Sequence, residues 1–339
     1  LAFVIMQILI SAGSISSLLQ GLMVPLCTYI ILAVSLNLVV GILGELSLGH
    51  AGFMCVGAFT SAFFSKCTRD VIASDGLRFF LALLIGIVTA AIFGMLIGIP
   101  VLRLKGDYLA IVTLAFGEII KNMVNVLYIG KDSKGFHVTT KDVMALNMDA
   151  DGTVILNGPQ GITGTPKNST FVIGFILILL TLFIVQNLIN SRDGRAIMAI
   201  RDNRIAAESI GINITKYKLM AFTISAAMAG AAGVLYAHNI STLTANTNNF
   251  GYNMSITILV FVVLGGIGNI RGSIIAAVIL TLLPELLRGM KDYRMLIYAI
   301  VLIVMMLFNW SPKAIEWREK LNDWRKKHFS FGKKAKEVE

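Results

Sequence analysis

The sequence contains few charged residues. Lys, Arg, Asp and Glu make up 14% of its 339 residues, while hydrophobic residues make up 56%. Soluble domains carry roughly 25% charged residues, so this chain has too little polar sequence to coat a water-soluble globule. The same hydrophobic content excludes intrinsic disorder. The composition therefore indicates a protein embedded in a membrane.

Motifs for metal and nucleotide binding are also missing. The three cysteines and four histidines show no ligand spacing, so we expect no metal site. A phosphate-binding loop needs the pattern GxxxxGK[ST], and at its nearest approach Phe136 stands where the lysine should be. No cluster of catalytic side chains is recognisable, which makes a membrane enzyme the least supported class. We expect neither ATP hydrolysis nor a cofactor on this chain.

Ten hydrophobic segments approach the length of about 20 residues that a membrane-spanning helix needs. They lie near residues 1–16, 20–40, 50–66, 79–101, 107–128, 170–190, 217–237, 253–270, 273–288 and 294–310. Their apolar runs are continuous, whereas the strands of a membrane barrel alternate. We therefore predict an all-α polytopic membrane protein with about ten transmembrane helices in one domain over residues 1–310.

Basic residues predict the orientation of this domain, because cytoplasmic loops are enriched in Lys and Arg. The segment 191–218 holds six basic residues against three acids, and the tail 311–339 holds nine against five. Both are assigned to the cytoplasm, as are both chain termini, and the long polar loop 128–169 then lies outside. The net charge of +10 is explained by these loops, so we expect no nucleic-acid partner.

Glycines interrupt the apolar run at 35–62, and two ionisable residues stand among them. Irregular backbone at membrane depth is tolerated only where protein or a wet cavity covers it, and ionisable groups there are candidates for function. Gly44, Glu45, Gly49 and His50 are therefore candidates for lining a translocation path. The alternative is an ordinary cytoplasmic turn in which Glu45 is solvated.

The cytoplasmic loop 191–217 contains charged residues that alternate with small and apolar ones. The spacing predicts a short amphipathic helix over 201–211 with a face of small residues, ended by Gly211. Such a helix can dock into a groove of a partner protein or lie on anionic lipid, and the residues alone favour neither. The candidate coupling residues are Arg201, Arg204, Ala206, Ala207, Glu208 and Gly211.

Five segments of the sequence form a recognisable set. They are SLNLVVGILGELSLGHAGF (35–53), LRLKGDYLAIVTLAFGEI (102–119), NGPQGITG (157–164), GRAIMAIRDNRIAAESIGINITKYKLMAF (194–222) and VLGGIGNIRGSIIAA (263–277). Together, and in this order, they resemble the LivM-type permeases of branched-chain amino acid ABC importers. The resemblance extends from about residue 35 to about residue 310. It implies a permease subunit in a bacterial-type plasma membrane.

The resemblance also implies partners and a coupling role. Permeases of ABC importers dock a cytoplasmic EAA-type loop onto the ATPase, and Ala206, Ala207, Glu208 and Gly211 resemble that loop, although the strict EAA order is absent. The implied partners are two ATP-binding cassette subunits, a LivH-like second permease and an extracytoplasmic substrate-binding protein, in addition to membrane lipid.

Two alternatives remain open at this point. One is a urea- or amide-type ABC permease of the same family. The other is a secondary amino acid transporter driven by protons or sodium through Glu45, His50 or Glu118, although Glu118 can equally form a local ion pair with Lys121 three residues later.

Overall fold

A computed structural model describes residues 7, 17–69, 71–102, 107–149, 152–287 and 293–310. The predicted segment 1–16, apart from residue 7, and the basic tail 311–339 lie outside the described residues. So do Arg103 and Lys105, which belong to the segment 102–119 quoted above.

Helices occupy each of the other predicted segments. They are α2 (Ser17–Asn37), continued by the π-helix η1 (Leu38–Leu43), α3 (His50–Cys67), α4 (Asp75–Val101), α5 (Asp107–Val126), α6 (Phe171–Asn190), α9 (Ile214–Ala237), α11 (Tyr252–Gly265), α12 (Ile270–Leu286) and α13 (Arg294–Trp310). The short helices are α7 (Arg192–Asp202), α8 (Arg204–Ser209) and α10 (Thr247–Phe250), with the 3₁₀ turns η2 (Met144–Leu146) and η3 (Gly158–Gln160).

Six helical segments in the described part of the chain are long and apolar enough to cross a bilayer. They are α2 with η1, α4, α5, α6, α9 and α10 with α11. Helices α3, α12 and α13 have 18, 17 and 17 residues, slightly fewer than the length of about 20 that spans the hydrocarbon core. The fold is thus mostly helical and multi-pass, while ten spans and two cytoplasmic termini stay predictions.

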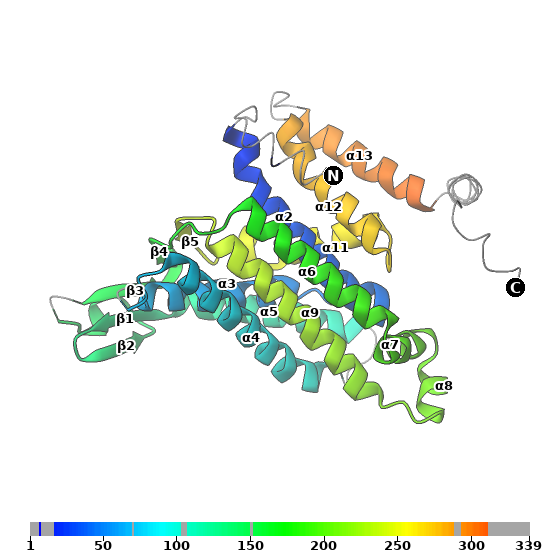
Figure 1. Ribbon diagram of the computed structural model, residues 1–339, viewed down its shortest axis with the longest axis horizontal. Coiled ribbons are helices and arrows are strands. Elements are labelled where there is room, and N and C mark those ends of the chain that lie inside the picture. Colours follow the sequence, from blue (N-terminus) through cyan, green and yellow to red (C-terminus); the bar gives the residue numbers. More distant parts are fainter. Residues whose placement is uncertain are drawn as a thin grey trace, which may run out of the picture.

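Helix α9 lies at the centre of the bundle, between α3, α4 and α2 (Figure 1). It can do so because its middle consists of small residues, AAMAGAAG, which let neighbouring backbones approach closely. A Cβ on Gly230 would lie 2.8 Å from the backbone oxygen of Gly86, and one on Gly233 would overlap the backbone oxygen of Met54. Phe222 and Phe53 then pack edge to face, with ring centroids 5.5 Å apart.

Helices α6 and α9 connect the two ends of the bundle (Figure 1). At one end, α6 leads into α7 and α8, from which the chain enters α9. The other end carries strands β1 (Tyr128–Asp132), β2 (Gly135–Thr139), β3 (Thr153–Asn157), β4 (Ile162–Thr163) and β5 (Thr242–Leu243). The predicted outer loop 128–169 and the predicted coupling loop 191–217 therefore lie at opposite ends.

The strands correct the expectation of an all-α fold. Strands β1, β2 and β3 form an antiparallel sheet in the order β2-β1-β3, and β4 pairs with β5. The hairpin between β1 and β2 closes over Ser133 and Lys134, and Gly135 follows it with a φ of 141°. The sequence of this region indicates turns, which are present, but it does not indicate the strands between them.

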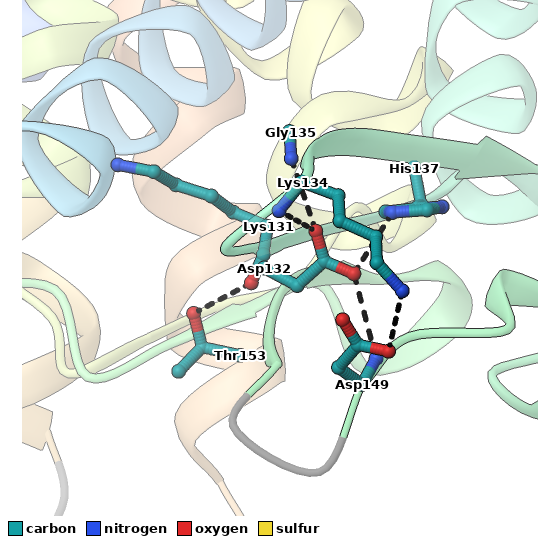
Figure 2. A network of polar contacts seen from close by, with 7 residues as sticks. All are labelled: Lys131, Asp132, Lys134, Gly135, His137, Asp149 and Thr153. Atoms are coloured by element: carbon teal, nitrogen blue, oxygen red, sulfur yellow. Dashed lines mark hydrogen bonds and ion pairs between the residues drawn. The ribbon is translucent and has the colours of Figure 1, made fainter.

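Asp132 holds this hairpin together, as Figure 2 shows. Its Oδ1 accepts hydrogen bonds from the backbone amides of Lys134 (2.8 Å) and Gly135 (3.0 Å). Its Oδ2 lies 2.9 Å from Nε2 of His137, and Lys134 reaches across to Asp149 at 2.9 Å. Although burial by itself raises the pKa of Asp132, these hydrogen bonds to the carboxylate outweigh it and lower the pKa below its ordinary value.

Candidate functional site

The candidate coupling region consists of two short helices instead of one. The predicted helix over 201–211 is interrupted at Asn203, whose backbone is extended (φ −154°, ψ 103°). The Asn203 side chain accepts a hydrogen bond from the amide of Ala206 at 3.1 Å and so caps the start of α8. Arg201 consequently belongs to α7, whereas the other candidates belong to α8 and its end.

Gly211 ends α8 as predicted. Its φ is +85°, a left-handed conformation that glycine adopts without a steric penalty. The amide of Gly211 donates to the carbonyl of Glu208 (3.0 Å), and that of Ile212 donates to the carbonyl of Ala207 (3.1 Å). This pair of bonds is the Schellman motif of helix C-termini.

The predicted face of small residues is only partly exposed, because one of its alanines is buried. Ala207 is 2% exposed and packs with Ile200 and Ile214 in a small core of its own. Its side chain is therefore not available to a partner, which corrects its assignment to the docking face. The apolar side chains that do project from this region are Ile205 and Ile210, 81% and 74% exposed. Both belong to the predicted alternation of charged and apolar residues, but they are not among the predicted coupling residues.

Arg204, Ala206 and Glu208 are exposed on the same short helix. Together with the two isoleucines they form what we call the α8 surface, defined as Arg204, Ile205, Ala206, Glu208 and Ile210. It is an apolar patch with one basic and one acidic residue beside it. A surface of this kind suits docking into a groove of another protein.

Arg201 connects α7 to the broken membrane helix. Its Nη1 donates a hydrogen bond of 3.0 Å to the carbonyl oxygen of Gly41, in η1. Carbonyls at the end of a helix lack a partner within the helix, and a guanidinium is a strong donor for such a group. Gly44, with a φ of +78°, leaves room for this side chain, since a Cβ there would lie 2.5 Å from Cγ of Arg201.

Glu45 forms an ion pair with Lys218 in the first turns of α9. The two side chains are 16% and 5% exposed, so the pair is largely enclosed by protein. Burial of either charge alone would be costly, and each compensates the other. Glu45 was predicted to line a path or to be solvated in a turn; the structure instead ties it to α9.

His50 and Gly49 also serve contacts inside the chain. His50 is 2% exposed, and its Nε2 lies 2.6 Å from Oγ of Ser35 on α2. A Cβ on Gly49 would overlap the carbonyl of Thr113 on α5, and the amide of the preceding residue, Leu48, donates to the Thr113 hydroxyl at 3.0 Å. In this conformation the predicted path residues hold α2, α3 and α5 together.

The glycine-rich break between α11 and α12 lies beside η1. This break, Gly266–Asn269, has φ values of +94° at Gly266 and +82° at Gly268, and a Cβ on Gly41 of η1 would overlap the backbone nitrogen of Gly268. Asn37, the last residue of α2, also joins the two regions: its Oδ1 accepts from the amide of Gly268 (2.9 Å), and its Nδ2 donates to Ser273 of α12 (2.9 Å). Sequence reasoning missed Asn37, although a lone amide within an apolar run is itself a signal.

Glu118 and Lys121 form the local ion pair that their spacing allowed. Lys121 also lies 3.3 Å from the hydroxyl of Thr247, and Glu118 accepts from the amide of Tyr252 at 2.8 Å. These contacts fasten α5 to the start of α11. Each ionisable residue named for a secondary transporter, namely Glu45, His50 and Glu118, thus has a partner within the chain.

Apolar helices of membrane length define a multi-pass membrane protein, and the contact of η1 with a glycine-rich helix break inside the bundle is typical of transporters. The chain belongs to the family described as "Branched-chain amino acid transport system / permease component", whose profile matches residues 18–308. Members of this family are permease components, which agrees with the absence of a phosphate-binding loop from the sequence.

Among its relatives, the chain is 35% identical to the high-affinity branched-chain amino acid transport system permease protein LivM of Salmonella typhimurium, covering 85% of this chain and 67% of the relative. It is 34% identical to LivM of Escherichia coli, with the same coverage. It is also 25% identical to LivH of Escherichia coli over 75% of this chain and 79% of that protein. No solved structure shows significant similarity to the chain.

Proposed function

We propose that this chain is one of two permease subunits of an ATP-driven importer for branched-chain amino acids in a bacterial-type plasma membrane. The similarity to LivM proteins supports the solute class, and the similarity to LivH supports a second permease of related fold. ATP is hydrolysed on two partner subunits, and an extracytoplasmic binding protein delivers the amino acid to the end that carries loop 128–169. Both termini lie in the cytoplasm.

In this proposal the α8 surface docks into a groove of an ATPase subunit. Ile205 and Ile210 enter the groove, because burying their exposed side chains is favourable. Arg204 and Glu208 meet polar groups at its rim and set the register. Ala207 and Gly211 act indirectly, by holding α8 in place.

The main support for the proposal is a pair of contacts that connect α7 and the start of α9 with η1 and the residues that follow it. Arg201 donates a hydrogen bond to the carbonyl of Gly41 in η1, and Lys218 forms an ion pair with Glu45, just after the end of η1. When the ATPase subunits close on ATP, the movement of α7 and α8 is transmitted through these links to η1 and the adjoining break. Because η1 contacts the break Gly266–Asn269 through Gly41, and Asn37 just before η1 bonds Gly268, η1 and this break change together and switch access between the two faces.

The test compares Ile210→Asp with Lys216→Gln, a substitution at an exposed polar residue nearby in α9. A buried carboxylate without a partner is strongly disfavoured, so Ile210→Asp should release the ATPase subunits on co-purification and abolish leucine uptake, with normal membrane insertion. Lys216→Gln should retain both. Normal uptake and normal co-purification in Ile210→Asp would refute the docking role.

The solute class is tested separately, by competition of leucine uptake with unlabelled valine, isoleucine and urea. Valine and isoleucine should compete and urea should not. Competition by urea alone would assign the chain to the urea- or amide-type branch and leave the coupling mechanism untouched.

A further inference from the structure

A cavity of about 620 Å³ lies at the end of the bundle that carries the strands. Helix α3 contributes Phe59, Phe63 and Cys67 to its wall, α4 contributes Phe93, α5 contributes Met123, and β2 contributes Phe136. Its size falls within the range of about 300–1,000 Å³ found for ligand pockets. None of the residues discussed for coupling or for the path lines it.

The cavity opens onto the lipid-facing surface of the bundle. Met123 and Phe136 at its edge are 61% and 57% exposed. On α4, next to the opening, Val88 and Ile92 are 53% and 50% exposed and are also apolar. In a chain embedded in a membrane, a cavity with such surroundings opens to hydrocarbon and not to water.

The walls offer a ligand almost no polar group. The two hydroxyls that line the cavity, those of Thr60 and Thr89, each donate to a carbonyl of their own helix, at 2.7 Å to Val56 and 2.9 Å to Ile85. Their oxygens lie 2.9 Å apart with both protons used in this way, and the thiol of Cys67 is a weak partner only. An amino acid zwitterion would lose the hydration of both its charges here without compensation, so the cavity is unsuited to the transported solute.

Two lysines lie beside the end of the cavity that the strands close. Lys66 is adjacent in sequence to Cys67, and its Nζ donates to the carbonyl of Val154 at 2.8 Å. The Nζ of Lys131 lies 6.0 Å from the ring centroid of Phe136. Within the described ranges neither ammonium pairs with a carboxylate. An apolar cavity with positive charge at one end matches a ligand with an apolar chain and an anionic head.

We propose that the cavity binds one acyl chain of an anionic phospholipid, whose phosphate lies within reach of Lys131 and Lys66. The lipid fills the space between α3, α4 and α5 and thereby braces the strands against the helices. This site depends on the chain being embedded in a membrane, and it is independent of which solute is carried and of how ATP hydrolysis is coupled.

The experiment uses the full chain, purified with its partner subunits, in nanodiscs that contain phosphatidylglycerol with a photoreactive group in its acyl chain. After illumination, peptide mass spectrometry should find adducts on Phe59, Phe63 or Met123 about tenfold more often than on Phe183, a 66% exposed residue of α6 that samples bulk lipid. Equal labelling of the cavity and of Phe183 would overturn the proposal.

Two pairs of variants test whether the labelling depends on the cavity and whether the headgroup preference depends on Lys131. Thr60→Trp fills the cavity and should lower these adducts about tenfold, whereas Leu84→Trp, on the exposed face of α4, should not. Lys131→Gln should remove the preference for phosphatidylglycerol over phosphatidylcholine, and Lys134→Gln, on the neighbouring turn, should retain it. Unchanged labelling in a folded Thr60→Trp, no headgroup preference in the unsubstituted chain, or crosslinks from the cavity to another subunit would each refute an anionic lipid as the occupant.

Discussion

Arg201 of α7 reaches the carbonyl oxygen of Gly41, 160 positions earlier in the chain, with a hydrogen bond of 3.0 Å. The same guanidinium bonds its neighbour Asp202 through Nε and Nη2 at 3.0 and 2.9 Å. The side chain is thereby held in one orientation while it spans the gap to η1. A single residue thus connects the exposed helix pair to the membrane helix that breaks.

We predict that Arg201→Lys impairs transport without preventing assembly. A lysine carries its charge at one point and cannot bond Asp202 and Gly41 in the same fork geometry. A hydrogen bond from a charged group contributes about 1.5–3 kcal/mol, so leucine uptake should fall about tenfold or more. The measurement is uptake normalised to the amount of chain in the membrane, with co-purification of the ATPase subunits.

The matched control is Arg195→Lys, at an exposed arginine of the same helix whose side chain bonds the carbonyl of Asn190. It should transport normally. If Arg201→Lys transports as well as this control, the hydrogen bond to Gly41 plays no part in transmitting the movement of α7 and α8 to η1.

Gly211→Ala should destabilise α8 through its backbone alone. No atom lies within 4 Å of the position of an added Cβ, but the φ of +85° costs a residue with a Cβ about 1–2 kcal/mol. The amides of Gly211 and Ile212, which close the helix end, should then exchange with deuterium faster. Gly76→Ala, equally unobstructed but within α4, should be neutral or stabilising; equal exchange in both variants would contradict the role of the left-handed conformation.

The hydrophobic spans could be predicted from sequence because each is a local property of a window of residues. The helices agree with the predicted segments to within a few residues in most cases, and Gly211 ends its helix where the pattern predicted. The interruption at Asn203 was missed because an asparagine can cap the start of a helix but can also lie within one. The sequence therefore did not show that one helix ends here and another begins. Which way Ala207 faces depended on that interruption, so its inward orientation could not be predicted either.

The contacts of the candidate site depend on pairs of residues far apart in the chain. Glu45 and Lys218 are separated by 173 positions, and Asn37 and Ser273 by 236. A single sequence identifies such residues as unusual for a membrane segment, but it does not identify their partners. The strands were missed for a related reason: β1 and β3 are paired across more than 20 residues, and their five-residue sequences lack a clear alternation of polar and apolar residues.

Asn37→Leu should destabilise the whole bundle. It removes the hydrogen bonds that join α2 to Gly268 and to Ser273 of α12, and it leaves the part-buried amide of Gly268 without its partner, at a cost of about 1–3 kcal/mol. The melting temperature of the purified chain should fall by several degrees. Asn253→Leu, at an exposed asparagine of α11, provides the comparison; a similar melting temperature for both variants would show that Asn37 does not hold α2 to the break between α11 and α12.

The β1–β2 hairpin should loosen in acid. The pKa of Asp132 is lowered in the folded chain, so its carboxylate stabilises the hairpin fully at pH values above its ordinary pKa of 3.8. That stabilisation is lost as the pH falls from this value through the lowered folded pKa, because protonation weakens the bonds from Lys134, Gly135 and His137. Proteolysis of residues 128–139 should therefore accelerate below about pH 4, measured with an acid-active protease and corrected for its own pH profile.

Asp132→Asn provides the control for this dependence. An asparagine keeps one acceptor oxygen for the turn but does not titrate. The hairpin of this variant should therefore be cleaved somewhat faster by protease at neutral pH, and its cleavage should not accelerate further in acid. Asp142→Asn, at an exposed carboxylate of the same loop, should behave like the unsubstituted chain. An acid-induced loosening of equal size in Asp132→Asn would mean that another group governs it, and His137, which faces Asp132 at 2.9 Å, would be the next residue to replace.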